Sequence, residues 1–259
     1  MAYTNRYESG PSFSIYFPKG VKWLLIVNIS LFVMYFFAVR FGGGGIFSHF
    51  ALVPAAVLQT LAFWQLVSYM FLHDPGGFGH ILFNMLSLWM FGADLERAWG
   101  TRRFLQFYFL CGIGAGICVI LANAILPWGS MRSRTIGASG AIYGLLLAFG
   151  MLWPDRTVLF SFLFPIKAKY FVMILGAIAF MSSFAGSDNN VSHFAHLGGM
   201  VFGYIYLKKA SGSQSYSRSK RSSLMATMRH RYQDWKMQRA KKRFQVYLRK
   251  QANRDRTIH

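Results

Sequence analysis

Three short segments place polar, reactive side chains inside otherwise apolar stretches of this 259-residue chain. They are His80-Ile-Leu-Phe-Asn84, Gly137-Ala-Ser139-Gly140 and His193-Phe-Ala-His196-Leu-Gly-Gly199. A serine hydroxyl becomes a nucleophile when a histidine takes its proton, because the histidine pKa lies near working pH. A serine that opens a helix also has free backbone N–H groups beside it, which favour a developing oxyanion. The pattern therefore predicts nucleophilic catalysis by Ser139.

Two histidines compete for the role of general base, because His193 and His196 are spaced i, i+3 and lie on related helix faces. His196 lies one turn further into its helix, where Gly199 and Gly203 allow a second helix to approach closely. His193 follows a polar run and is expected to be solvated. We assign the base to His196. No Asp or Glu occurs at the same depth, so the sequence predicts a Ser-His dyad rather than a triad.

Each of these features also has a simpler explanation. A lone serine in a membrane helix usually bonds its own backbone, a lone histidine at a helix end is usually interfacial, and stripes of small residues usually serve packing. The packing stripe here consists of Gly140, Gly144, Gly199 and Gly203. The functional interpretation is favoured because polar residues from three separate stretches converge on one depth, where each is costly to bury in lipid.

The elements that must position these residues are predicted to be membrane helices. With 54% hydrophobic and 14% charged residues, the chain is too apolar for an ordinary soluble domain. Stretches near the ~20 residues that a helix needs to cross a bilayer occur six times. We place them at Lys22 to Val39, His80 to Arg97, Arg103 to Leu126, Gly137 to Trp153, Lys169 to Phe184 and Asn190 to Leu207. Because lipid leaves no partner for exposed backbone groups, the predicted fold class is all-α, with six transmembrane helices.

Charge distribution predicts the orientation of these helices. More than half of the 28 Lys and Arg residues follow Leu207, so the C-terminal end is expected to be cytoplasmic. Six spans then put the N-terminus there too. The stretch Phe47 to Leu72 contains Pro54 and two glutamines, and is interpreted as an outer loop lying in the interface. The predicted organisation is an N-terminal cytoplasmic segment (1–20), a six-span domain (21–208) and a basic cytoplasmic tail (209–259).

The tail begins with a Ser-rich run, 211–223, that is typical of a flexible linker. Beyond it Leu224, Met228, Tyr232 and Trp235 recur at helical spacing among many Lys and Arg residues. One interpretation is an amphipathic helix on anionic lipid; the other is a solvated, partly disordered tail that only enforces orientation. Both stay open. A nucleic-acid partner is not expected, because basic charge at a membrane surface already has a partner.

At the three segments the chain resembles the rhomboid intramembrane proteases, in motif order and spacing from about Val21 to Lys208. The resemblance implies Ser139 as nucleophile and His196 as general base. It implies an oxyanion hole made by His80, Asn84 and the Ser139 backbone N–H. It also implies a serine endopeptidase that cuts membrane proteins near the outer end of their transmembrane helices. Where many members have Trp-Arg in the first outer loop, this chain has Trp64-Gln65, so any role of that arginine is in doubt.

No metal or cofactor is implied by this chemistry. An inactive rhomboid-like protein that binds membrane clients is a second possibility, but such members generally lack the Ser or the His. A metal enzyme or transporter that uses His80, His193 and His196 is a third possibility. The sequence argues against it, because it has no inward carboxylate and no His-Glu-x-x-His pattern. The expected location is the bacterial inner membrane. Cys111 and Cys118, on one predicted helix, are expected to serve packing.

Overall fold

The computed structural model describes residues 17–127, 129–160, 164–183, 193–209 and 235–239. The predicted linker 211–223, most of the amphipathic tail and the start of the sixth predicted helix lie outside these residues. By its internal contacts the chain divides into two units, Met1–Leu207 and Lys208–His259. The first unit contains all three of the segments that carry polar, reactive side chains.

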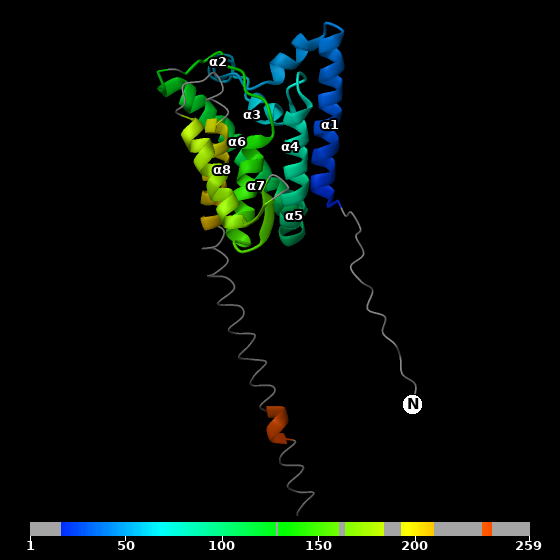
Figure 1. The fold of residues 1–259 in the computed structure, drawn as a ribbon, viewed down its shortest axis with the longest axis vertical. Helices are drawn as coiled ribbons and strands as arrows, with labels where there is room; N and C mark the ends of the chain where they lie inside the picture. Colours follow the sequence, from blue (N-terminus) through cyan, green and yellow to red (C-terminus); the bar gives the residue numbers. More distant parts are fainter. Residues whose placement is uncertain (1–16, 128, 161–163, 184–192, 210–234, 240–259) are drawn as a thin grey trace, which may run out of the picture. The chain divides into compact units, whose positions relative to one another are not determined.

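The first unit is mainly helical (Figure 1). In chain order its elements are α1 (Lys19–Arg40), the 3-10 helix η1 (Gly44–Phe50), α2 (Pro54–Gln59), α3 (Gln65–Ser68), the 3-10 helix η2 (Tyr69–Phe71), α4 (Phe78–Ser87), the π-helix η3 (Leu88–Gly92), α5 (Ala93–Trp99), α6 (Thr101–Ile125), α7 (Ser139–Leu152), β1 (Thr157–Phe160), β2 (Phe164–Lys167) and α8 (Ala168–Ser182). A further helix covers 193–209.

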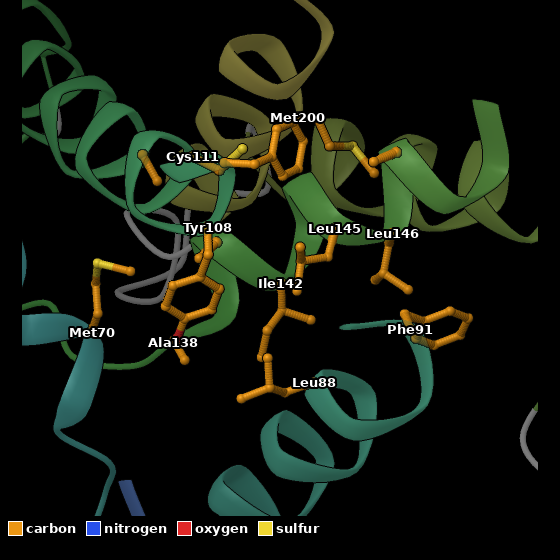
Figure 2. Close-up of a cluster of buried hydrophobic side chains, with 14 of the residues drawn as sticks. Met70, Leu88, Phe91, Tyr108, Cys111, Ala138, Ile142, Leu145, Leu146 and Met200 are labelled. Carbon is orange, nitrogen blue, oxygen red and sulfur yellow. The ribbon is translucent and has the colours of Figure 1, made fainter. Parts of the chain in front are cut away.

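The core is centred on α7, which is apolar on nearly all sides. Figure 2 shows Leu145 and Leu146 of α7 among side chains of neighbouring elements, including Leu88 of η3 and Cys111 of α6. Phe91 of η3 packs edge-on against the ring of Phe149, with centroids 5.0 Å apart. A helix that is hydrophobic all round must be buried among other elements. This surrounding core fixes α7, and therefore the serine at its first residue.

The all-α prediction is wrong in one element. Strands β1 and β2 pair antiparallel between α7 and α8, with Val158 opposite Ile166. The segment is rich in β-branched and aromatic residues, which favour paired strands over helix. The carboxylate of Asp155, just before β1, forms ion pairs with Lys167 at the end of β2 and with Lys169 in α8. The described residues are therefore mainly helical, with one small sheet among them.

The six predicted helices have counterparts in the structure with altered boundaries. The second is continuous only as α4, η3 and α5, because π-helical turns interrupt its middle. The fourth begins at Ser139 rather than Gly137, because Gly137 has a φ of +122° that no right-handed helix accommodates. Among the described residues, α1 and α6 are the helices long and apolar enough to cross a membrane by length and composition alone. The count of six spans therefore stays a prediction.

The segment 41–77 contains the predicted outer loop, Phe47 to Leu72, and is called the outer loop below after that prediction; it forms only short helices. Figure 1 shows η1, α2 and α3 gathered at one end of the first unit, with α5 at the other. Gln65 is buried and connects two parts of the loop by hydrogen bonds. Its side-chain oxygen accepts from Val53 N–H at 3.0 Å, and its amide nitrogen donates to the His49 carbonyl at 3.1 Å. Trp64 donates to the same carbonyl at 3.1 Å. Gln65, at the position where the resemblance implies an arginine in many members, thus has a structural role of its own.

Candidate active site

Two side chains far apart in sequence meet at the start of α7. The hydroxyl of Ser139 lies 2.9 Å from Nε2 of His196, within hydrogen-bond distance. Ser139 is the first residue of α7, after Ala138 as N-cap, so its own N–H is one of the four that a helix leaves without an internal partner. The contact brings a hydroxyl, an imidazole and a backbone N–H together at one point, which are the groups that nucleophilic catalysis by serine requires.

Small residues make this contact possible. A methyl group on Gly199 would overlap the carbonyl oxygen of Gly140, and one on Gly144 would lie 3.1 Å from the Gly199 carbonyl. A methyl group on Gly140 would lie 3.3 Å from the carbonyl of Ala195. Helix 193–209 and α7 therefore touch backbone to backbone, as small-residue stripes in membrane helices permit. That approach carries His196 to Ser139.

Tyr143 is a site residue that the motif analysis missed. Its ring stacks on the ring of His196, with centroids 4.0 Å apart and planes only 2° apart. Nδ1 of His196 is buried without a hydrogen-bond partner in the part of the chain that the structure describes. The stack therefore supplies ring orientation where a triad would use a carboxylate. The available signal was the spacing, because Tyr143 lies four residues after Ser139 on the same helix face.

His80 and Asn84 lie on the opposite wall. A methyl group built on Gly137 would lie 3.0 Å from Nε2 of His80 and 3.9 Å from Oγ of Ser139. The space in front of Gly137 is thus bordered by both the histidine and the serine. Asn84 is buried and donates one amide hydrogen to the His80 carbonyl at 2.8 Å. An amide nitrogen carries two hydrogens, so one stays available to a ligand.

The segment that leads into Ser139 is held in extended form by the outer loop. Leu52 and Thr135 exchange two backbone hydrogen bonds, of 3.0 and 2.9 Å, and Gly137 N–H donates to the Tyr69 carbonyl at 2.9 Å. Successive backbone groups of an extended chain point to opposite sides. The backbone groups of Ile136 therefore face away from the outer loop. No backbone partner for them occurs among the described residues.

These walls enclose a cavity of about 540 Å³. Its polar lining includes Asp74, His80, Asn84, Arg134, Ser139 and His196. Its apolar lining includes Phe83, Ile142, Leu146, Phe171 and Leu175. An apolar cavity with a few converging polar groups is the usual form of a site for a small ligand or a peptide segment. The lining comes from α4, α7, α8 and helix 193–209, together with Asp74 before α4 and residues 134–136 before α7, so the cavity lies among the segments that carry the motifs.

The other candidate base is placed differently. His193 is the first described residue of helix 193–209, and its ring lies 5.8 Å from that of His196 at 83°. The hydrogen bond to Ser139 is made by His196. In the part of the chain that the structure describes, no three His, Cys, Asp or Glu side chains are grouped as metal ligands would be. Cys111 and Cys118 are both free thiols.

A Rhomboid domain profile matches residues 60–212, which is more than half of the chain and includes all three motifs. The chain belongs to the rhomboid family. Rhomboid family proteins are integral membrane proteins, and the rhomboid proteases among them are intramembrane serine proteases.

Curated relatives carry the same family name. The chain is 30% identical to the rhomboid protease GluP of Bacillus subtilis, over 73% of this chain and 35% of GluP. It is 32% identical to rhomboid protein 1, mitochondrial, of Saccharomyces cerevisiae, over 50% of this chain and 37% of that protein. It is 34% identical to RHOMBOID-like protein 2 of Arabidopsis thaliana, over 54% of this chain and 40% of the relative. The chain thus spans well under two thirds of the length of these relatives.

Proposed function

We propose that this rhomboid family member is an intramembrane serine endopeptidase that cuts membrane proteins near the outer end of a transmembrane segment. The observation that carries the proposal is the 2.9 Å contact between Ser139 Oγ and His196 Nε2. A serine side chain in a membrane helix has no need of a histidine from another helix for packing. A nucleophile and its base must be in this contact, since the proton has to pass directly between them.

The reaction follows from the geometry. His196 Nε2 takes the proton of Ser139 as the hydroxyl oxygen bonds to the peptide carbonyl carbon. The carbonyl oxygen becomes an oxyanion, for which His80, Asn84 and the Ser139 N–H are the donors. His196 then gives its proton to the leaving amine, and the C–N bond breaks. Water attacks the acyl-serine by the same steps, which releases the new carboxylate and restores the serine. No metal or cofactor takes part.

The cavity supports a peptide substrate. The backbone N–H and C=O of Ile136 have no backbone partner among the described residues, and an extended chain can pair with such an edge. The apolar lining accepts side chains from a membrane helix. A regular helix hides its carbonyls, so the substrate must unwind locally before Ser139 reaches one. Ends of transmembrane helices unwind most readily, which favours cleavage near the outer end.

Orientation is a further part of the proposal. The excess of Lys and Arg after Leu207 supports cytoplasmic N- and C-termini and an active site that opens to the outer face. The proposed membrane is the bacterial inner membrane. The basic tail is proposed to lie on anionic lipid, since charged residues near a membrane surface gain from that contact. In detergent, a chain truncated after Ser211 should keep its catalytic activity. Loss of activity in a folded truncated protein would make the tail part of the catalytic machinery.

The test of the function uses a fluorophosphonate probe and a reporter transmembrane substrate. Ser139→Ala should abolish both probe labelling and cleavage while the protein stays folded, because one hydroxyl at a helix start contributes little to packing. Cleavage by a purified Ser139→Ala protein would overturn the mechanism.

A matched pair of substitutions tests the base. His196→Ala should eliminate labelling and cleavage, whereas His193→Ala should keep most of each, because its ring makes no hydrogen bond to Ser139 in this structure. The opposite pattern would move the base to His193. Asn84→Ala should lower kcat by about 10²- to 10³-fold with little change in KM, as loss of one oxyanion donor does.

A further inference from the structure

His80 is held by a backbone group just before its own helix. The N–H of Asp74 donates to Nδ1 of His80 at 3.4 Å. Asp74 is itself fixed in a turn, because its carboxylate accepts from Gly76 N–H at 2.9 Å and its carbonyl from Gly77 N–H at 3.5 Å. The donor therefore belongs to an ordered turn of the outer loop. It meets Nδ1 of His80, whereas Nε2 is the ring nitrogen that lies beside Gly137.

This hydrogen bond determines where the proton of His80 lies. A neutral imidazole carries one hydrogen, and the nitrogen that accepts a hydrogen bond cannot carry it. With Nδ1 accepting from Asp74, the hydrogen must be on Nε2. Nε2 is the atom that borders the space in front of Gly137, 3.0 Å from the position of an added methyl group. The donor hydrogen is thereby directed toward the place where the substrate carbonyl oxygen would lie.

A second residue limits the orientation of the ring. His73 is fully buried, and its ring centroid lies 5.1 Å from that of His80 at an interplanar angle of 54°. Burial lowers the pKa of His73 to about 3, so it stays neutral at physiological pH. His73 therefore acts as an uncharged wall behind His80. Rotating the His80 ring would break the Asp74 contact and press against this wall.

We propose that Asp74, through its backbone N–H, and His73, through packing, are positioning residues that keep His80 in the Nε2–H form with this hydrogen directed at the oxyanion site. The inference rests on the proposed function for its kinetic consequence. The tautomer of His80 does not depend on the proposed function, because it is a property of the protein without substrate.

The direct test is the tautomer itself. The full-length protein, labelled with ¹⁵N-histidine and held in lipid nanodiscs, is compared by NMR with a His80→Gln protein to assign the His80 signals. We expect a protonated Nε2 and an unprotonated Nδ1 at neutral pH. A proton on Nδ1, or rapid exchange between the two forms, would overturn the proposal. Neither result depends on proteolysis, so failure here is distinguishable from failure of the proposed function, which Ser139→Ala tests.

Two isosteric substitutions give a kinetic test. The amide nitrogen of His80→Gln can take the position of Nε2, whereas that of His80→Asn takes the position of Nδ1. We expect kcat of the Gln variant to exceed that of the Asn variant by about 10-fold or more, with similar KM, because oxyanion donors act mainly in the transition state. Equal kcat values, or a better Asn variant, would contradict the assignment of Nε2.

A second pair of substitutions separates the role of the Asp74 backbone N–H from that of the Asp74 carboxylate. Asp74→Ala keeps the N–H and Asp74→Pro removes it. We expect kcat of the Pro variant to be about 10-fold below that of the Ala variant, a fraction of the 10²- to 10³-fold cost of losing a donor. The NMR spectrum of the Pro variant should show mixed tautomers. An unchanged tautomer in a folded Pro variant would remove Asp74 from the mechanism.

Discussion

The ring of Tyr143 lies flat against the ring of His196, with centroids 4.0 Å apart. Tyr143 and Ser139 share one face of α7, so a single helix carries both the proposed nucleophile and the surface against which the ring of His196 rests. A catalytic carboxylate would hold a histidine through its Nδ1–H. Here Nδ1 has no partner among the described residues. Planar contact with an aromatic ring is the restraint that the structure supplies in its place.

Tyr143→Ala should therefore lower kcat by about 10²-fold, because a base displaced by about 1 Å loses that much in rate. Tyr143→Phe keeps the ring and should lose far less. The measurement is kcat and KM on a reporter transmembrane substrate, with thermal unfolding as a check on folding. If the Phe variant fell as far as the Ala variant, the hydroxyl and not the stack would be the important feature.

Gly137→Ala should inactivate the protein for two independent reasons. The φ of +122° is strained for any residue with a side chain, and the added methyl group would lie 3.0 Å from His80 Nε2. The methyl group also occupies the space proposed for the oxyanion. We expect kcat to fall by at least about 10²-fold, as loss of an oxyanion donor does. Gly45→Ala is the control, because a methyl group there meets nothing within 4 Å. Substantial activity in Gly137→Ala would place the oxyanion elsewhere.

The sequence predicts those parts of the site that depend on side-chain type and helical spacing. Ser139, His196 and the glycine stripe can be read from it because each helix has one inward face with a fixed period. The contact between Asp74 N–H and His80 cannot be predicted this way, because every residue but proline has the same backbone donor. The π-helix η3 likewise follows from a change in backbone hydrogen bonding that no residue marks.

The outer loop shows the same limit. Its replacement of arginine by Gln65 is visible in the sequence, but the role of the glutamine is not. The side chain has both a donor and an acceptor, and it uses them on His49 and Val53. An arginine has no acceptor and could not make both bonds. The loop is thus held by two hydrogen bonds that an arginine at position 65 could not both make.

Gly199→Ala should move His196 away from Ser139 without changing either residue. The added methyl group would overlap the carbonyl oxygen of Gly140, and neither backbone can move without shifting its helix. Helix 193–209 would have to withdraw from α7 and take His196 away from Ser139. We expect loss of fluorophosphonate labelling together with a lower Tm. Gly176→Ala is the matched control, since its methyl group would lie 3.5 Å from the sulfur of Met200, an ordinary contact. Full labelling of Gly199→Ala would show that the two helices are not in backbone contact.

Away from the candidate active site, Glu96 of α5 connects that helix to the start of α1. Its buried carboxylate accepts from the backbone N–H groups of Gly20 and Val21, each at 2.8 Å, and from the Thr101 hydroxyl at 2.6 Å. The N–H groups of Gly20 and Val21 open α1, where the N-cap Pro18 offers no side-chain cap. An acidic group at a helix N-terminus also gains from the helix dipole. Glu96 is therefore the cap of a helix that lies 76 residues away in sequence.

Glu96→Ala should destabilise the protein by about 2–4 kcal/mol, because it leaves two buried N–H groups and a hydroxyl without an acceptor. Asp94→Asn provides the contrast, since Asp94 pairs with Arg97 and Arg156, each about half exposed, and such surface pairs contribute about 0–1 kcal/mol. Unfolding in mild detergent measures both. Gly20→Ala should resemble a weaker Glu96→Ala, because its methyl group would lie 3.0 Å from the carboxylate and displace it. Equal stability of the Glu96→Ala and Asp94→Asn proteins would mean that water replaces the carboxylate at the start of α1, and that this helix is not fastened by Glu96.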